Sequence, residues 1–146
     1  MNQKHFKRVI LNAALILVLT AITGFMYGQA VIEQLTTPGA SVDTRAWNMA
    51  HLECLLNALL MLSVATATKF LTVSQKQSST LSWALITCGW TNAVASTSSA
   101  LTGGRGAIAT GMDWNTLNHG LFLVGVLAFV LVIASLLIAT LKTSES

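Results

Sequence analysis

Charged side chains are scarce in this chain of 146 residues. Only 9% of its residues are Asp, Glu, Lys or Arg, whereas soluble domains carry roughly 25%. Hydrophobic residues make up 53%, and the mean hydropathy is +0.67. This composition excludes an ordinary soluble domain. The net charge of +3 is spread along the chain, so we do not expect nucleic acid as a partner.

Cysteine and proline are also rare. The two cysteines, Cys54 and Cys88, fall inside apolar runs, so we expect buried free thiols and no disulfide framework. The sequence has no C-x-x-C-H motif, which excludes covalently attached haem, and no Cys and His cluster at zinc spacing. The single proline, Pro38, lies between the first two apolar runs.

Four long apolar runs predict an all-α protein. They cover residues of about 9–26, 47–70, 81–101 and 114–141. About 20 apolar residues span a bilayer as a helix, so we predict a four-transmembrane-helix bundle that forms one integral membrane domain over residues 1–146. The first run follows basic residues, as a signal peptide does. Because the sequence after it is a poor cleavage site, we expect a retained helix.

Basic residues are distributed unevenly between the two sides that this topology defines. If the N-terminus is cytoplasmic, six of the eight Lys and Arg lie on the inner side, and only Arg45 and Arg105 lie on the outer side. Cytoplasmic segments of membrane proteins are enriched in Lys and Arg. We therefore predict that both termini are cytoplasmic and that the protein lies in a bacterial cytoplasmic membrane.

The stretch from Asn48 to Asn57 concentrates polar groups near the start of the second run. Between its two terminal carboxamides it holds His51, Glu53 and Cys54. Ionisable groups in membrane helices are costly and mark functional sites by default. At about 100° per residue, we expect His51, Cys54 and Asn57 to follow one broad face and Glu53 to point to nearly the opposite side.

Polar residues of the third and fourth runs complete the set of candidates. Cys88, Asn92 and Ser96 form a stripe at spacings of four, with Asn92 near mid-membrane. His119 is expected at a depth similar to that of His51. Small hydroxyl residues and carboxamides also join helices in membranes, and this packing role is the alternative for the stripe.

A histidine on a membrane helix is suited to axial ligation of haem, because neutral imidazole is the commonest metal ligand. With His51 as the only axial ligand, the iron keeps an open position for Lewis-acid chemistry. With His119 as a second ligand, the site is that of an electron carrier. Glu53 is a candidate proton donor or shuttle, and Asn57 and Asn92 are candidates for orienting a small polar group.

Two short motifs occur in the second and third runs. They are Ala50-His51-Leu52-Glu53-x-x-x-Asn57 and Gly89-Trp90-Thr91-Asn92. Both resemble elements of the small four-helix membrane isomerases, which include hydroxylaminobenzene mutase and styrene oxide isomerase. The first motif is more similar to the mutase branch, which we favour. A tyrosine and an aspartate found on helix three of styrene oxide isomerase are replaced here by Ser96 and Cys88.

The resemblance implies an activity, a cofactor and an assembly. We expect a membrane-bound isomerase of a small apolar aromatic substrate, favouring conversion of hydroxylaminobenzene to 2-aminophenol by intramolecular hydroxyl transfer. An epoxide-to-aldehyde rearrangement is the alternative. In styrene oxide isomerase, haem b lies between subunits of a trimer, so the resemblance makes His51 the haem and metal ligand and Asn57 a substrate-orienting residue. Haem in the mutase branch is carried over by analogy.

The expected catalytic residues are Glu53, Asn57 and Asn92. Two other functions remain open from the residues alone. One is a bis-histidine b-type cytochrome subunit with His51 and His119 as ligands. The other is a non-enzymatic small transporter or accessory protein, in which the polar stripes line a path or an interface.

Overall fold

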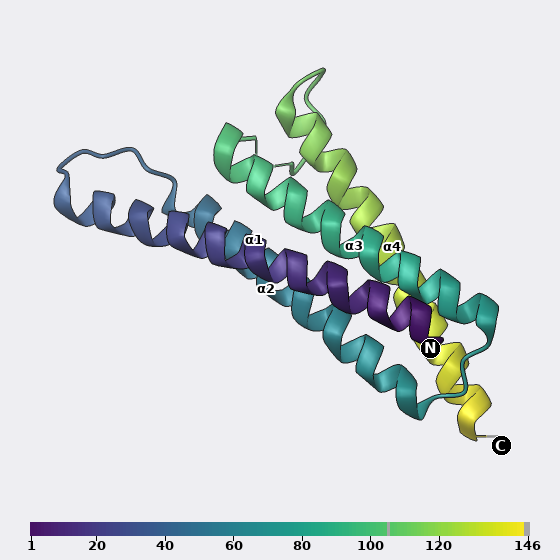
Figure 1. Ribbon diagram of the computed structural model, residues 1–146. Coiled ribbons are helices and arrows are strands. Elements are labelled where there is room, and N and C mark those ends of the chain that lie inside the picture. Colours follow the sequence, from purple (N-terminus) through teal and green to yellow (C-terminus); the bar gives the residue numbers. More distant parts are fainter. Residues whose placement is uncertain (105, 145–146) are drawn as a thin grey trace.

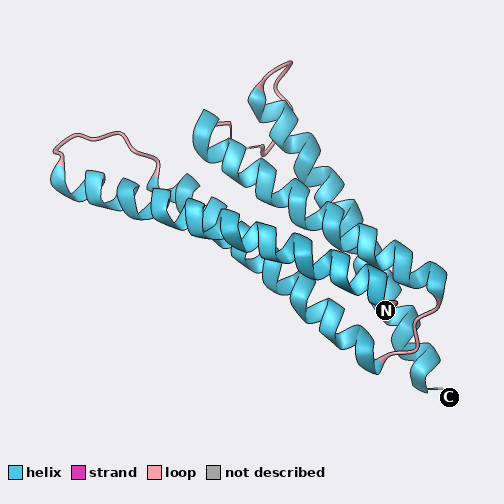
Figure 2. Ribbon diagram, viewed as in Figure 1, coloured by secondary structure: helices cyan, strands magenta, loops and turns pink. Residues whose placement is uncertain are grey.

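The computed structural model describes residues 1–104 and 106–144, and it is helical throughout except for the connections (Figure 2). Four long helices follow one another, with a short 3-10 helix η1 (Thr68–Phe70) after the second. The long helices are α1 (Gln3–Thr36), α2 (Thr44–Ala67), α3 (Gln75–Thr102) and α4 (Trp114–Ser144). The predicted all-α fold with four helices is confirmed.

The first helix is longer than the apolar run that predicted it. The run covers residues 9–26, whereas α1 continues to Thr36 and the connection to α2 is only 37–43. Hydropathy marks the part of a helix that can lie in lipid, whereas polar helix-forming residues continue the same helix outside it. The helix ends just before Pro38, because the residue that precedes a proline disfavours helical conformations.

Local sequence signals fix the other helix ends. The Asp43 side chain accepts a hydrogen bond from the Ala46 backbone N–H and thereby caps the start of α2. Ser74 and Gln77 form a reciprocal capping box at the start of α3. Gly103 ends α3 in the left-handed conformation, with a φ of 73°, which glycine adopts without steric cost.

Helix α3 is the central element of the arrangement. It packs against α1, α2 and α4, whereas the described part of α4 has its close backbone neighbours on α3 alone among the long helices. Figure 1 shows α1 paired with α2 and α3 paired with α4, with the two pairs diverging toward the 37–43 and 103–113 connections. Helix α3 therefore joins the two pairs.

Met1 and the end of α4 lie at one end of the described structure, beside the connection between α2 and α3 (Figure 1). The N-terminal ammonium group of Met1 is 3.3 Å from the carbonyl oxygen of Thr68. The Thr72 backbone N–H donates to the hydroxyl of Thr143 over 2.8 Å. The start of α1 and the end of α4 thus share one side, as the predicted topology requires, and the cytoplasmic assignment of that side stays a prediction.

Three of the described helices are long and apolar enough to cross a membrane, namely α1, α2 with η1, and α4. Together they indicate an integral membrane protein. Helix α3 does not reach this hydropathy, because serine and threonine are frequent in it. Several of its polar side chains, such as Ser78, Ser82 and Ser96, are buried, so α3 has less need of an apolar surface. Large hydrophobic side chains of α4, such as Leu127 and Leu137, are exposed instead.

Candidate functional site

Four polar side chains from α2 and α3 form one hydrogen-bonded group, here named the polar cluster: Glu53, Asn57, Cys88 and Asn92. The Asn57 amide donates to the Glu53 backbone carbonyl over 2.8 Å and to its carboxylate over 3.2 Å. The Asn57 carbonyl oxygen accepts from the Asn92 amide over 3.4 Å and from the Cys88 thiol over 3.7 Å. The structure therefore brings together the three residues that were expected to be catalytic.

The polar cluster lines a cleft between α2 and α4, here named the central cleft, with a volume of about 360 Å³. Its lining combines the polar cluster with Leu56, Leu60, Gly125, Val126 and Phe129. An engineered apolar cavity of about 150 Å³ holds benzene, so the central cleft is large enough for a monocyclic aromatic molecule. Its apolar walls suit the ring, and its polar side suits a small hydrogen-bonding substituent.

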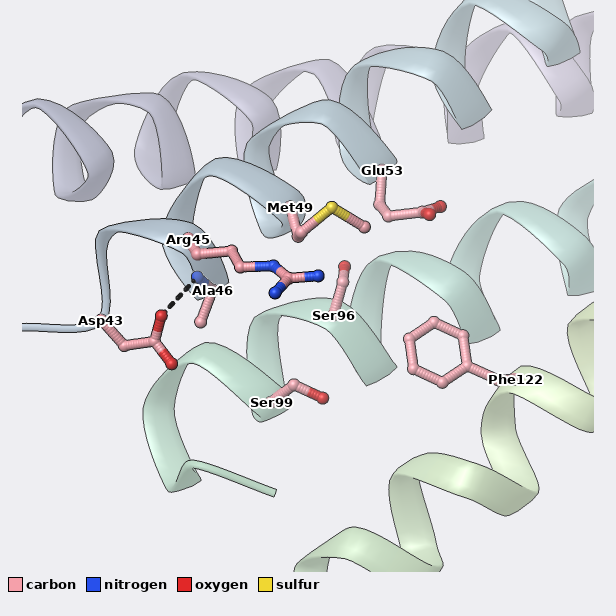
Figure 3. A pocket seen from close by; sticks show the side chains of 8 residues that line it. All are labelled: Asp43, Arg45, Ala46, Met49, Glu53, Ser96, Ser99 and Phe122. Carbon is pink, nitrogen blue, oxygen red and sulfur yellow. Dashed lines mark hydrogen bonds between the residues drawn. The ribbon is translucent and has the colours of Figure 1, made fainter. Parts of the chain in front are cut away.

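A second cleft, here named the loop-side cleft, adjoins the first at Glu53 and has a volume of about 190 Å³. Its lining includes Arg45, Met49, Glu53, Ser96, Ser99 and Phe122. Figure 3 shows the Arg45 side chain extending from α2 toward α3, while Glu53 lies further along the same cleft. Glu53 thus lines both the loop-side cleft, which also holds Arg45, and the central cleft.

Asn92 depends on a close approach of α4. A Cβ atom at Gly125 would collide with the carboxamide oxygen of Asn92 and would come within 2.9 Å of the Thr91 hydroxyl oxygen. Only a glycine at this position leaves room for Asn92 in its present orientation. Gly125 was not predicted from the sequence, because glycine is common in membrane helices and its partner is known only once the helices are paired.

His51 lies on another side of α2 and contacts α1. Its Nδ1 atom is 3.0 Å from the Thr20 carbonyl oxygen, and the ring packs against Gly24. The prediction that His51 and Asn57 lie on one face of α2 is therefore wrong. Six residues at about 100° each turn the helix by about 600°, which is about 120° short of two full turns. The side chains of His51 and Asn57 therefore point about 120° apart. The expectation that Glu53 and His51 diverge is confirmed.

His119 lies near the start of α4 and contacts the connection that precedes this helix. Its Nδ1 atom is 3.1 Å from the Gly106 carbonyl oxygen. The neighbouring Asn118 is buried and donates to the Ser99 hydroxyl and the Gly104 carbonyl. These contacts hold the 103–113 connection to α4. Within one chain, His51 faces α1 and His119 faces this connection, so the structure does not bring the two histidines together.

Gly89, Trp90 and Asn92 of the Gly-Trp-Thr-Asn motif contact other helices. Gly89 allows close packing, because a Cβ atom there would be 2.8 Å from the Met61 sulfur atom. The indole N–H of Trp90 donates to the Asn12 side chain of α1 over 2.8 Å. Asn92 joins the polar cluster. The motif therefore links α3 to all three of its neighbours, and only its last residue reaches the central cleft.

The two residues that depart from styrene oxide isomerase occupy different positions. Cys88 is a buried free thiol within the polar cluster, as Cys54 is a buried free thiol elsewhere on the α2–α3 contact. The buried Ser96 donates to the Ala93 carbonyl and lines the loop-side cleft. No group of three or more His, Cys, Asp or Glu side chains in the described residues is arranged to hold a metal ion.

Comparison with known proteins gives one family match. The family model described as styrene oxide isomerase matches residues 5–141. This range covers nearly the whole chain and contains every residue that lines the two clefts. No match is found among curated proteins.

Proposed function

The chain belongs to the styrene oxide isomerase family, and we propose that it is a membrane-bound isomerase of a small aromatic substrate bound in the central cleft. The family implies isomerase chemistry. The observation that carries the proposal for this chain is the polar cluster, in which one carboxylate and two carboxamides meet beside apolar walls. A substrate that is mostly apolar with one polar substituent matches this lining and can enter from the lipid.

The favoured reaction is conversion of hydroxylaminobenzene to 2-aminophenol. Substrate and product are isomers, because the hydroxyl group leaves nitrogen and returns to the ortho carbon of the ring. The cluster supports this choice: the N–H and O–H groups of a hydroxylamine can pair with the Asn57 and Asn92 carboxamides. The tyrosine and aspartate of styrene oxide isomerase are absent, since Ser96 and Cys88 stand in their places.

Glu53 supplies the proton transfers of this scheme. A proton from Glu53 to the hydroxylamine oxygen weakens the N–O bond, and the bond breaks with its electron pair leaving on oxygen. The same oxygen then bonds to the ortho carbon as its extra proton returns to the Glu53 carboxylate. The ring proton at that carbon passes to nitrogen, which restores the aromatic ring. Asn57, which is bonded to Glu53, positions both the carboxylate and the substrate.

His51 is the proposed ligand of a haem b. Its donor chemistry fits, because the bond from Nδ1 to the Thr20 carbonyl leaves the Nε2 lone pair for a metal ion. When bound, the haem iron would supply a Lewis acid for the substrate oxygen. We do not propose a bis-histidine cytochrome, because His51 and His119 contact different elements of the chain.

The complete site is proposed to lie between subunits. His51 faces α1, while the polar cluster faces the central cleft, so one chain does not direct both toward a single substrate. In a homo-oligomer, with a trimer as the form that the resemblance implies, the His51 face of one subunit can complete the cleft of the next. We further propose that the end bearing both termini faces the cytoplasm of a bacterial cell, in the inner membrane.

The test is turnover by detergent-purified protein supplied with haem during expression. We expect 2-aminophenol from hydroxylaminobenzene, with Asn57→Ala strongly impaired, and an absorption spectrum that changes on substrate addition. Conversion of styrene oxide to phenylacetaldehyde, without mutase activity, would replace the favoured substrate by the alternative. Failure to convert either substrate with haem bound would overturn the proposal. A haem absorption spectrum that is unchanged in His51→Ala would overturn the assignment of His51 as the ligand.

A further inference from the structure

The imidazole of His51 occupies a notch on the surface of α1. A Cβ atom at Gly24 would be 2.8 Å from His51 Nδ1 and 2.9 Å from Cε1, which is closer than real Cβ atoms approach other atoms. One turn earlier in α1, the Thr20 carbonyl oxygen is 3.0 Å from the same Nδ1 atom. The ring therefore reaches the backbone of α1 only because residue 24 has no side chain.

This contact determines which ring nitrogen carries the proton. A carbonyl oxygen can only accept a hydrogen bond, so in neutral His51 the hydrogen is on Nδ1 and the lone pair is on Nε2. In metal sites, the hydrogen bond made by one ring nitrogen of a histidine likewise determines that the other nitrogen is free to bind the metal. We infer that Gly24 is a positioning residue that, with the Thr20 carbonyl, holds His51 in the Nδ1–H tautomer.

The face of α1 around Gly24 is buried and hydrogen-bonded, so the acceptor for His51 is held in place. Thr20 and Thr23 are buried, and the Thr23 hydroxyl donates to the Leu19 and Thr20 carbonyls, which anchors it to the backbone of its own turn. The acceptor is a backbone atom in the middle of a long helix, so it cannot rotate away as a side-chain acceptor can. The geometry of the imidazole is thus set by the pairing of α1 with α2.

The use of Nε2 as a haem ligand rests on the proposed function, but the position and tautomer of His51 do not. If the notch acts as inferred, loss of the Nδ1 hydrogen bond releases the ring and lets the other tautomer form. Haem would then bind a ring that is no longer oriented, and its affinity would fall. The two effects are separable, because the tautomer is measured without haem.

Gly24→Ala is the test, and Gly28→Ala is its matched control. Gly28 lies one turn later on α1 and has no atom within 4 Å of an added Cβ. Both substitutions raise helix propensity by about 1 kcal/mol, so a loss seen only at residue 24 is not a weakening of the helix. The tautomer is read from ¹⁵N chemical shifts of labelled histidine in haem-free protein, at a pH where imidazole is neutral. The His51 signals are assigned by their disappearance in His51→Gln.

The expected result is Nδ1–H for His51 in the wild type and in Gly28→Ala, and a mixture of tautomers in Gly24→Ala, with at least a tenfold weaker haem affinity. A wild-type His51 in the Nε2–H form overturns the inference, and this measurement holds even if Gly24→Ala does not fold. An unchanged tautomer in Gly24→Ala also overturns it. Absence of isomerase activity together with the expected tautomers would reject the proposed function. It would not contradict the role of Gly24 in holding His51.

Discussion

The Asn57 carboxamide donates a hydrogen bond to the Glu53 carboxylate over 3.2 Å, from one turn further along α2. The other end of the same carboxamide accepts from Asn92 of α3 over 3.4 Å. Asn57 thereby connects the carboxylate of one helix to the carboxamide of another. Its loss would change the orientation of both neighbours, so we regard Asn57 as the residue on which the geometry of the polar cluster depends.

Replacement of Asn57 by alanine is expected to lower kcat by about 10² to 10³-fold, which is the cost of removing one preorganised polar group from an active site. The thiol of Cys88 and the amide of Asn92 would lose a shared acceptor. The measurement is the rate of 2-aminophenol formation by purified protein. A rate within threefold of the wild type, in a variant that still folds, would remove Asn57 from the catalytic residues.

Replacement of Glu53 by glutamine keeps the size and hydrogen bonding of the side chain but removes its exchangeable acidic proton. We expect kcat to fall by about 10² to 10⁴-fold, the usual contribution of general acid and base groups. Glu33→Gln is the control, because Glu33 is an exposed carboxylate beyond the apolar run of α1. Equal rates for the two variants would mean that Glu53 has a structural role.

Gly125→Ala is expected to displace Asn92 and to lower activity, while Gly120→Ala is expected to leave it unchanged. An added Cβ meets the Asn92 carboxamide at residue 125, but meets nothing within 4 Å at residue 120 of the same helix. Both changes favour the helix equally. The readout is KM and kcat together with the melting temperature. A similar loss in both variants would indicate a general effect on α4 and would argue against this placement of Asn92.

Much of this arrangement follows from the sequence. The four apolar runs predicted the helices, and the polar residues at spacings of four in α3 predicted the stripe that carries Cys88 and Asn92. The length of α1 was underestimated, because hydropathy measures the fit to lipid and not the extent of a helix. The separation of His51 from Asn57 was missed, because small angular steps were treated as one face.

The glycine contacts were beyond the reach of sequence reasoning. Gly24 and Gly125 matter because of side chains on other helices, His51 of α2 and Asn92 of α3. Gly28 and Gly120 occur in the same two helices and meet nothing within 4 Å. No local pattern distinguishes the two kinds of glycine. The distinction requires the rotation and register of packed helices, which depend on the whole tertiary arrangement.

A site shared between subunits predicts complementation. His51→Ala and Asn57→Ala chains are each expected to be inactive alone. Co-expressed, they are expected to recover part of the activity, because some interfaces then combine the intact His51 of one chain with the intact Asn57 of the other. Co-expression of His51→Ala with the double variant is the negative control. No recovery in oligomers shown to contain both chains would place the complete site within one subunit.

The connection before α4 is expected to lose order in acid. The Thr110 hydroxyl and the Thr116 backbone N–H both donate to Asp113, and these bonds lower the pKa of Asp113 below its ordinary value of 3.8. The stabilisation is therefore complete above that value and is lost as the pH falls through the lowered pKa. Exchange of the Thr116 amide, measured against pH, reports the loss. Asp113→Asn keeps a capping side chain but should lack the pH dependence.

We propose that this chain moves a hydroxyl group within one substrate molecule. The most direct measurement is mass spectrometry of the product made by purified protein from hydroxylaminobenzene labelled with ¹⁸O. We expect 2-aminophenol that retains the label, formed by the wild type and by Gly28→Ala but not by Asn57→Ala. A product whose hydroxyl oxygen comes from unlabelled water, or the absence of 2-aminophenol from active-site-intact protein with haem bound, would contradict it.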